Sequence, residues 1–155
     1  MLYTTLDSPI GKLLLTSDGE NLTGIRMAPF EIESDWSHEP KALAETTTQL
    51  KAYFAGKLKR FDLPLKTSGT PFQTRVWKAL ADIPYGETVS YGELARRIGS
   101  PRAVRAVGRA NGANRIAIVL PCHRVIGANG TLTGYGGGLD RKAKLLALEG
   151  LAIPA

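Results

Sequence analysis

Hydrophobic and polar residues alternate in the first part of the chain in the way that half-buried β-strands require. The alternation runs over residues 11–17 and again over residues 22–27, with a polar, glycine-containing stretch at residues 18–21 between them. Two such segments around a turn sequence predict a β-hairpin. We therefore expect a small β-sheet in this part of the molecule.

Apolar positions change to helical spacing after residue 40. Residues 41–55 carry apolar side chains at roughly helical intervals, and Gly56 follows where a helix would end. Residues 57–69 show no clear period and contain Pro64. We expect this segment to connect two subdomains, the first of which spans residues 1–67.

Capping residues mark the start of another helix near residue 70. Thr70 stands at the N-cap, Pro71 at the first helical position, and Gln73 where its side chain can bond back to the N-cap amide. An apolar stripe follows at helical spacing and consists of Phe72, Val76, Trp77 and Leu80. The pattern predicts a helix that buries one face.

Two short helices are predicted next, with a glycine-containing turn between them. Ser90 and Glu93 form a second capping box, and Gly99 should end that helix. Ser100-Pro101 should start a third helix at once and carry it to about Asn111-Gly112. This arrangement is typical of a helix-turn-helix.

The remaining segments are short. Residues 116–120 are entirely apolar, which predicts a buried strand that leads to the cysteine. Asn129-Gly130 predicts a tight turn, residues 135–138 a pliable glycine-rich loop, and residues 140–149 a last helix ended by Gly150.

The overall prediction is an α+β fold with two parts. A small subdomain of β-sheet and helix occupies residues 1–67, and a mainly helical domain with the helix-turn-helix and the cysteine occupies residues 68–155. A hydrophobic content of 43% over 155 residues suffices for a packed core. No apolar run reaches the length of a membrane span, and the first residues do not resemble a signal peptide, so we expect a cytoplasmic protein.

Charge is distributed unevenly between the two parts. Residues 1–67 contain eight Lys or Arg against nine Asp or Glu, whereas residues 68–155 contain twelve against five. Between Glu93 and Asp140 there are seven arginines and no acidic residue. This excess suggests a polyanionic partner, most simply nucleic acid, with an ordinary solvated basic face as the alternative.

In the predicted third helix, Arg102, Arg105 and Arg109 fall on one side, within about 60° of one another at 100° per residue. Small side chains lie beside them, and two valines beyond these should face the core: Ala103, Ala106, Ala110, Val104 and Val107. Arginines can bind phosphates while alanines allow a close approach to DNA. An ordinary surface helix is the alternative. Few base-reading side chains are present, so we expect weak sequence preference.

The only cysteine of the chain, Cys122, directly precedes His123, one of two histidines. A lone cysteine forms no intramolecular disulfide, and these residues make no credible zinc site. The thiol is therefore either a nucleophile or an inert buried side chain. Neighbouring side chains on an extended segment point apart, so contact with His123 requires a turn or a bridging water. Glu149 is a candidate to orient the imidazole.

Several motifs together resemble the O6-alkylguanine-DNA alkyltransferase family, the methylated-DNA-protein-cysteine methyltransferases. They are Pro121-Cys122-His123-Arg124-Val125, Tyr91, the Arg-Ala-Val around Arg105, Asn114, Thr133-Gly134-Tyr135 with its glycines, and Glu149. The resemblance covers roughly residues 70–150, and the first part fits more loosely. It implies direct repair of duplex DNA, with O6-alkylguanine as substrate and O4-alkylthymine as a further candidate. Because a thioether is not reset by thiol exchange, each molecule would act once.

The resemblance also implies roles at the reacting centre. Cys122 would accept the alkyl group, His123 would take its proton through a water, and Glu149 would hold His123. Asn114 would orient the segment around the cysteine. Tyr91 would donate a hydrogen bond or proton to the departing guanine. We expect no metal and no cofactor.

The resemblance implies a second set of roles, in DNA binding. Arg105 would enter the base stack where the target nucleotide is flipped out, since an alkyl group inside a duplex is out of reach of a buried thiol. The helix would lie in the minor groove, which suits its alanines. Arg102, Arg109 and Ala106 would contact the backbone, and the base would be bound beside Tyr135, Gly136 and Gly137. We expect a monomer, and cooperative packing on DNA is left open.

Two departures limit the transfer of these roles. Many relatives carry Pro where this chain has Arg115, and many carry Ser, Ala or a bulkier residue where it has Gly136-Gly137. We expect the open loop to admit adducts larger than methyl. A helix-turn-helix regulator with a structural or redox-sensing Cys122 and a cysteine hydrolase remain as alternatives.

Overall fold

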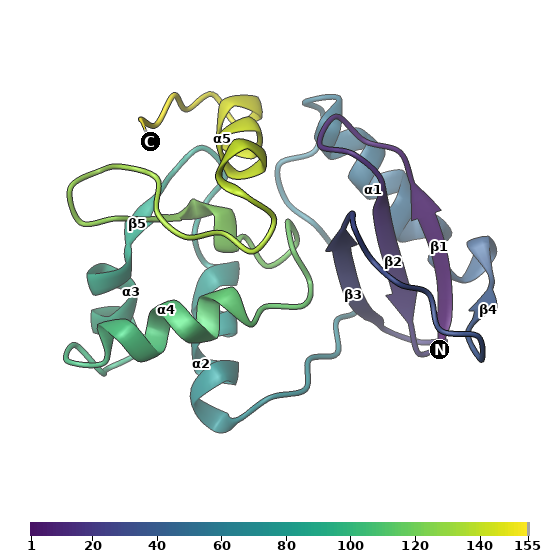
Figure 1. The fold of residues 1–155 in the computed structure, drawn as a ribbon, viewed down its shortest axis with the longest axis horizontal. Coiled ribbons are helices and arrows are strands. Elements are labelled where there is room, and N and C mark those ends of the chain that lie inside the picture. Colours follow the sequence, from purple (N-terminus) through teal and green to yellow (C-terminus); the bar gives the residue numbers. More distant parts are fainter. Residues whose placement is uncertain (155) are drawn as a thin grey trace. The chain divides into compact units, whose positions relative to one another are not determined.

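A computed structural model describes residues 1–154. The chain forms two compact units, one of residues 1–67 and one from Ser68 onward, and Figure 1 shows the course of each. Within the described part of the chain, no helix is both long enough and apolar enough to cross a membrane.

The first unit is built on a four-stranded sheet (Figure 1). Its strands are β1 (Leu2–Leu6), β2 (Leu13–Ser17), β3 (Leu22–Met27) and β4 (Ser37–His38), in the order β3-β2-β1-β4. β2 runs antiparallel to both neighbours, and all five of its residues are buried. The predicted hairpin is therefore confirmed as β2 and β3.

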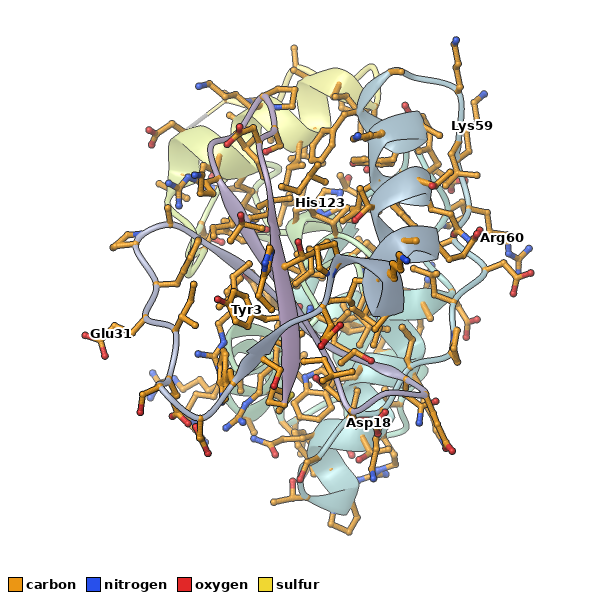
Figure 2. All side chains as sticks on the ribbon, turned by 90° about the vertical axis from the view of Figure 1, so that its right-hand side faces the viewer. Tyr3, Asp18, Glu31, Lys59, Arg60 and His123 are labelled. Carbon is orange, nitrogen blue, oxygen red and sulfur yellow. The ribbon has the colours of Figure 1, made fainter. Side chains whose placement is uncertain are left out.

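A helical segment follows this sheet. The 3-10 turn η1 (Pro40–Leu43) packs against β1 and β2, and α1 (Ala44–Phe54) buries Leu50 and Tyr53. The helix predicted for residues 41–55 is thus confirmed, with a tighter first turn. Charged side chains of this unit, among them Glu31 and Arg60, project into solvent (Figure 2).

The second unit is mainly helical. Its elements are α2 (Pro71–Ala81), β5 (Val89–Ser90), α3 (Tyr91–Arg97), α4 (Val104–Gly112), the 3-10 turn η2 (Cys122–Arg124), β6 (Val125–Ile126) and α5 (Leu139–Leu148). α2, α3 and α4 pack against one another, α5 packs on η2, and β5 pairs with β6 in parallel. A small sheet with helices in one unit and a helical second unit confirm the predicted α+β class.

The predicted caps set the starts of α2 and α3. At α2, the Thr70 hydroxyl accepts from the Gln73 amide at 3.1 Å, and the Gln73 side chain accepts from the Thr70 amide at 2.9 Å. At α3, the Ser90 hydroxyl accepts from the Glu93 amide at 3.0 Å. The Glu93 carboxylate binds Arg96 and the next residue instead of returning to the cap, so this second box is only half formed.

The prediction for the third helix is wrong at its start. α4 begins at Val104, because residues 100–103 form a turn in which the Ala103 amide donates to the Ser100 carbonyl at 2.9 Å. Pro101 occupies the second position of this turn, where its fixed φ suits a β-turn as well as a helix. Arg102 therefore precedes the helix, and Val104 is 38% exposed rather than facing the core.

The strand predicted for residues 116–120 is also wrong. The segment is a run of turns in which Ile118 adopts a φ of 75° and the Leu120 amide donates to the Ile116 carbonyl. The Asn114 side chain closes it, accepting from the Ile116 amide at 3.0 Å and donating to the Leu120 carbonyl at 2.8 Å. These apolar residues are buried by a compact loop, which periodicity alone does not distinguish from a strand.

Candidate active site

Cys122 stands at the first position of η2 and is 6% exposed. Asn114 fixes the approach to it through the Leu120 carbonyl, and Asn111 on α4 donates to the Cys122 carbonyl at 3.4 Å. The backbone around the thiol is thereby held from two directions. Burial raises the pKa of the thiol, and this rise is opposed by hydrogen bonding to Asn114, by the charge of Lys142 and by Tyr135. Burial therefore favours the protonated thiol over the thiolate.

His123 and Glu149 meet, as their predicted pairing requires. His123 is fully buried, and its Nε2 lies 2.7 Å from Oε2 of Glu149, the residue that caps the C-terminus of α5. Arg124 binds the same carboxylate with two nitrogens, Nε at 2.8 Å and Nη2 at 3.0 Å. The Gly86 amide adds a fourth donor at 3.2 Å. Three buried ionisable side chains therefore form one hydrogen-bonded network.

The network selects one form of the histidine ring. A carboxylate paired with arginine only accepts hydrogen bonds, so His123 must donate from Nε2. In the neutral ring the lone pair then lies on Nδ1, which has no hydrogen-bond partner within residues 1–154. Burial lowers the pKa of His123, whereas Glu149 raises it, and Arg124 and Lys142 lower it further. The lowered pKa favours the neutral ring, and its unpartnered Nδ1 carries the lone pair that can accept a proton.

Tyr91 and Lys142 converge on the loop that follows β6. The Tyr91 hydroxyl lies 3.2 Å from the Thr133 carbonyl and 3.4 Å from the Gly134 carbonyl. The Lys142 ammonium donates to the same two carbonyls at 2.8 and 3.3 Å. Burial raises the pKa of Tyr91 and lowers the pKa of Lys142 to about 8. Two polar side chains on different helices thus anchor one loop.

That loop contains the residues predicted to bind a base. Tyr135 is half-buried, its ring lies 5.9 Å from Lys142 Nζ, and it also interacts with Cys122. Gly136 is exposed, Gly137 is half-buried, and a Cβ atom added at Gly136 would meet no other atom within 4 Å. The Gly138 amide donates to the Tyr135 carbonyl at 3.0 Å. The loop is held at its ends and is open at its centre.

The basic surface lies on and before α4. Arg105 and Arg109 are exposed on the helix, Ala106 is half-buried, and Arg102 is exposed in the preceding turn. Ala110 is buried rather than part of an exposed alanine strip, and its carbonyl accepts a 2.8 Å hydrogen bond from Trp77 Nε1. The helix is thus fixed to α2 while its arginines remain available to solvent.

Comparisons with known proteins identify both units. The chain matches models of two domains of 6-O-methylguanine DNA methyltransferase, the ribonuclease-like domain over residues 1–67 and the DNA binding domain over residues 71–151. The chain belongs to this family. A methylated-DNA–protein-cysteine methyltransferase of Mycolicibacterium paratuberculosis is 58% identical over 99% of this chain and 94% of its own length. One from Methanosarcina acetivorans is 53% identical over 97% and 99%.

Solved structures agree with this assignment to the methyltransferase family. A crystal structure of Mycobacterium tuberculosis OGT in complex with DNA has a TM-score of 0.93 and 57% identity, covering 100% of this chain and 96% of that one. A structure of the O6-methylguanine methyltransferase of the same organism has a TM-score of 0.90. Both units therefore have the folds found in the family.

Sequence reasoning missed three contributors to this site: Asn111, Lys142 and the role of Arg124. The sequence places Asn111 only near the end of a helix, whereas in the structure it is 4% exposed and donates to the Cys122 carbonyl. Lys142 carried no signal, because a lysine on an amphipathic helix is ordinarily solvated. Arg124 belongs to the motif around the cysteine, yet only the fold shows that it binds Glu149.

Proposed function

We propose that this protein repairs DNA directly, by moving the alkyl group of O6-alkylguanine in duplex DNA onto Cys122. The observation that carries the proposal is the position of the only cysteine, buried beside the residues of the His123–Glu149–Arg124 network in a DNA-binding domain of this family. The names of the relatives and the neighbour solved with DNA support it.

The reaction starts with loss of the thiol proton. We assign this proton to Nδ1 of His123, reached through a water, while Glu149 stabilises the imidazolium that forms. Sγ of Cys122 then attacks the alkyl carbon, and the S–C bond forms as the C–O bond breaks. The electron pair of the C–O bond leaves with the guanine. Tyr91 gives the departing guanine a proton, and its phenolate then regains a proton from the His123 imidazolium through solvent. The net change is transfer of the alkyl group to sulfur and of the thiol proton to the base.

The product limits each molecule to one transfer. S-alkylcysteine is a thioether and has no sulfur–sulfur bond for a thiol to exchange. Since the chain has no second cysteine, the protein is consumed in proportion to the lesions it repairs. O4-alkylthymine is a second candidate substrate, because it also carries an alkyl group on an exocyclic oxygen.

The lesion must leave the duplex to reach a buried thiol. We propose that α4 enters the minor groove, that Arg105 fills the space of the flipped nucleotide, and that Arg102, Ala106 and Arg109 contact the backbone. The flipped base would bind against Tyr135 and the backbone at Gly136 and Gly137. The open loop supports acceptance of adducts larger than methyl.

We further propose that the protein acts as a monomer in the cytoplasm, where reducing conditions preserve its unpaired thiol. Its binding to DNA should have little dependence on sequence, because arginines that contact phosphates carry no base information.

The deciding experiment uses duplex DNA that carries O6-methylguanine with a labelled methyl group. We expect one label per chain, attached to Cys122 and absent in Cys122→Ala. DNA binding without transfer would favour a regulator, and repeated turnover of a hydrolysable substrate would favour a hydrolase. Arg105→Ala should slow repair of the duplex more than reaction with a free base analogue, and equal losses would contradict a flipping role.

A further inference from the structure

The carboxylate that holds His123 is also bound by the neighbouring Arg124. Arg124 gives Glu149 two hydrogen bonds, at 2.8 and 3.0 Å, and its third nitrogen donates to the Ile83 carbonyl at 2.6 Å. Its guanidinium also lies 5.8 Å from the centre of the Tyr85 ring. Arg124 is 6% exposed, so a fixed cation sits beside the proton acceptor of the reaction.

A buried carboxylate without this cation would change the state of the histidine. An uncompensated Glu149 would favour the doubly protonated ring, and a proton on Nδ1 would occupy the position that must receive the thiol proton. The charged groups that act on His123 are Glu149 and Lys142 from the α5 side and Arg124 from η2. Both cations oppose the effect of Glu149, and only Arg124 touches it.

We propose that Arg124 is a positioning residue for alkyl transfer: it fixes Glu149 and offsets its charge, so that His123 starts the reaction neutral with its Nδ1 lone pair available. This inference rests on the proposed function. With its charge offset by Arg124, Glu149 can orient the His123 ring without favouring the doubly protonated form. After the thiol proton arrives, the same carboxylate stabilises the imidazolium.

The protonation state of His123 can be measured without DNA, because the chain has only two histidines. In a His38→Gln background, NMR of ¹⁵N-labelled histidine reports His123 alone. We expect a neutral ring with the proton on Nε2 at pH 7, and a doubly protonated ring in the same protein would overturn the proposal. Arg124→Met should raise the pKa of His123, Arg124→Lys should raise it less, and the exposed control Arg60→Met should leave it unchanged.

A second pair of variants keeps the test decisive if Arg124→Met does not fold. Glu149→Gln removes the carboxylate charge and leaves the arginine, whereas Arg124→Met with Glu149→Gln removes both charges. The pKa of His123 should be higher in the double variant than in Glu149→Gln, because only the cation differs. Equal values would show that Arg124 does not act on the ring.

The rate of transfer gives an independent readout. Single-turnover transfer to Cys122 should fall about tenfold per pH unit below the pKa of the proton acceptor, and Arg124→Met should move this fall to higher pH. An unchanged pH profile in Arg124→Met, with normal transfer by the parent, would refute the role of Arg124 alone. Absence of transfer in the parent would instead refute the proposed function, whatever the NMR titration shows.

Discussion

Replacing Glu149 by Gln should destabilise the second unit strongly, although the two side chains have nearly the same shape. The carboxylate accepts hydrogen bonds from Arg124 twice, from His123 and from the Gly86 amide, at 2.7 to 3.2 Å. The amide offers one acceptor oxygen and turns an NH2 group toward donors. At least two donors lose their partner, and Arg124 is left as a buried charge without a counterion.

The expected magnitude follows from this count. A buried donor without a partner costs about 1–3 kcal/mol, and breaking a buried ion pair by removing one member costs about 3–5 kcal/mol. Two such donors would cost about 2–6 kcal/mol, a range that contains the ion-pair figure, so we expect a loss of roughly 3–5 kcal/mol. This is a large part of the roughly 5–15 kcal/mol that stabilises an ordinary domain. With a urea dependence of about 2 kcal/mol per molar, the midpoint should fall by roughly 1.5–2.5 M.

The assay can follow the second unit by itself, because each unit contains one tryptophan. Trp77 is 4% exposed in the second unit, and Trp36→Phe removes the fluorescence of the first. Urea unfolding should be compared with Glu93→Gln, which removes a partly exposed carboxylate that also binds two arginines. We expect a far smaller change for Glu93→Gln, since exposed ion pairs contribute little.

A double-mutant cycle tests whether the unpaired charge of Arg124 causes the loss of stability, as well as how large the loss is. Arg124→Met combined with Glu149→Gln removes both charges and should lie closer to the parent than the sum of the single losses predicts. The reasoning is refuted if Glu149→Gln shifts the midpoint no more than Glu93→Gln, or if the two losses are additive.

Three further predictions use other features of the second unit. Gly69→Ala should lower the stability of the second unit by about 1–3 kcal/mol in urea unfolding, because a Cβ there would lie 2.5 Å from the Trp77 ring. The control Gly112→Ala, with open space around the added Cβ, should be neutral or stabilising. The pKa of Lys142 is lowered to about 8, so between pH 8 and 10 the unfolded chain binds more protons than the folded protein. Over this range the unfolding free energy of the parent should rise by about 1–2 kcal/mol relative to that of Lys142→Met, after allowance for solvent screening. The same pH dependence of the unfolding free energy in both proteins would contradict this prediction. Gly137→Trp should slow the reaction with benzylguanine more than with methylguanine in single-turnover assays, and unchanged benzyl reactivity would show that this residue forms no wall of the base pocket.

The sequence-based predictions that the structure confirmed depend on interactions between residues close together in the chain. Thr70 and Gln73 needed no tertiary contact to define the start of α2, and the alternation of residues 11–27 defined the hairpin. The predictions were wrong where the same local sequence is compatible with two different backbone structures. Pro101 suits a turn as well as a first helical turn, and an apolar run can be buried in a loop as well as in a strand.

The sequence by itself determined the α+β class, the β2–β3 hairpin and the capped starts of α2 and α3. It also determined the family and the pairing of His123 with Glu149 that the resemblance implied. Only the tertiary structure brought the Arg124 guanidinium and the Gly86 amide onto the Glu149 carboxylate and placed Lys142 near enough to act on His123. The reason is that a motif records which chemical groups are present near one another along the chain. Burial and the neutralisation of one charge by another depend on what packs around those groups, and that is decided when α5 and η2 come together.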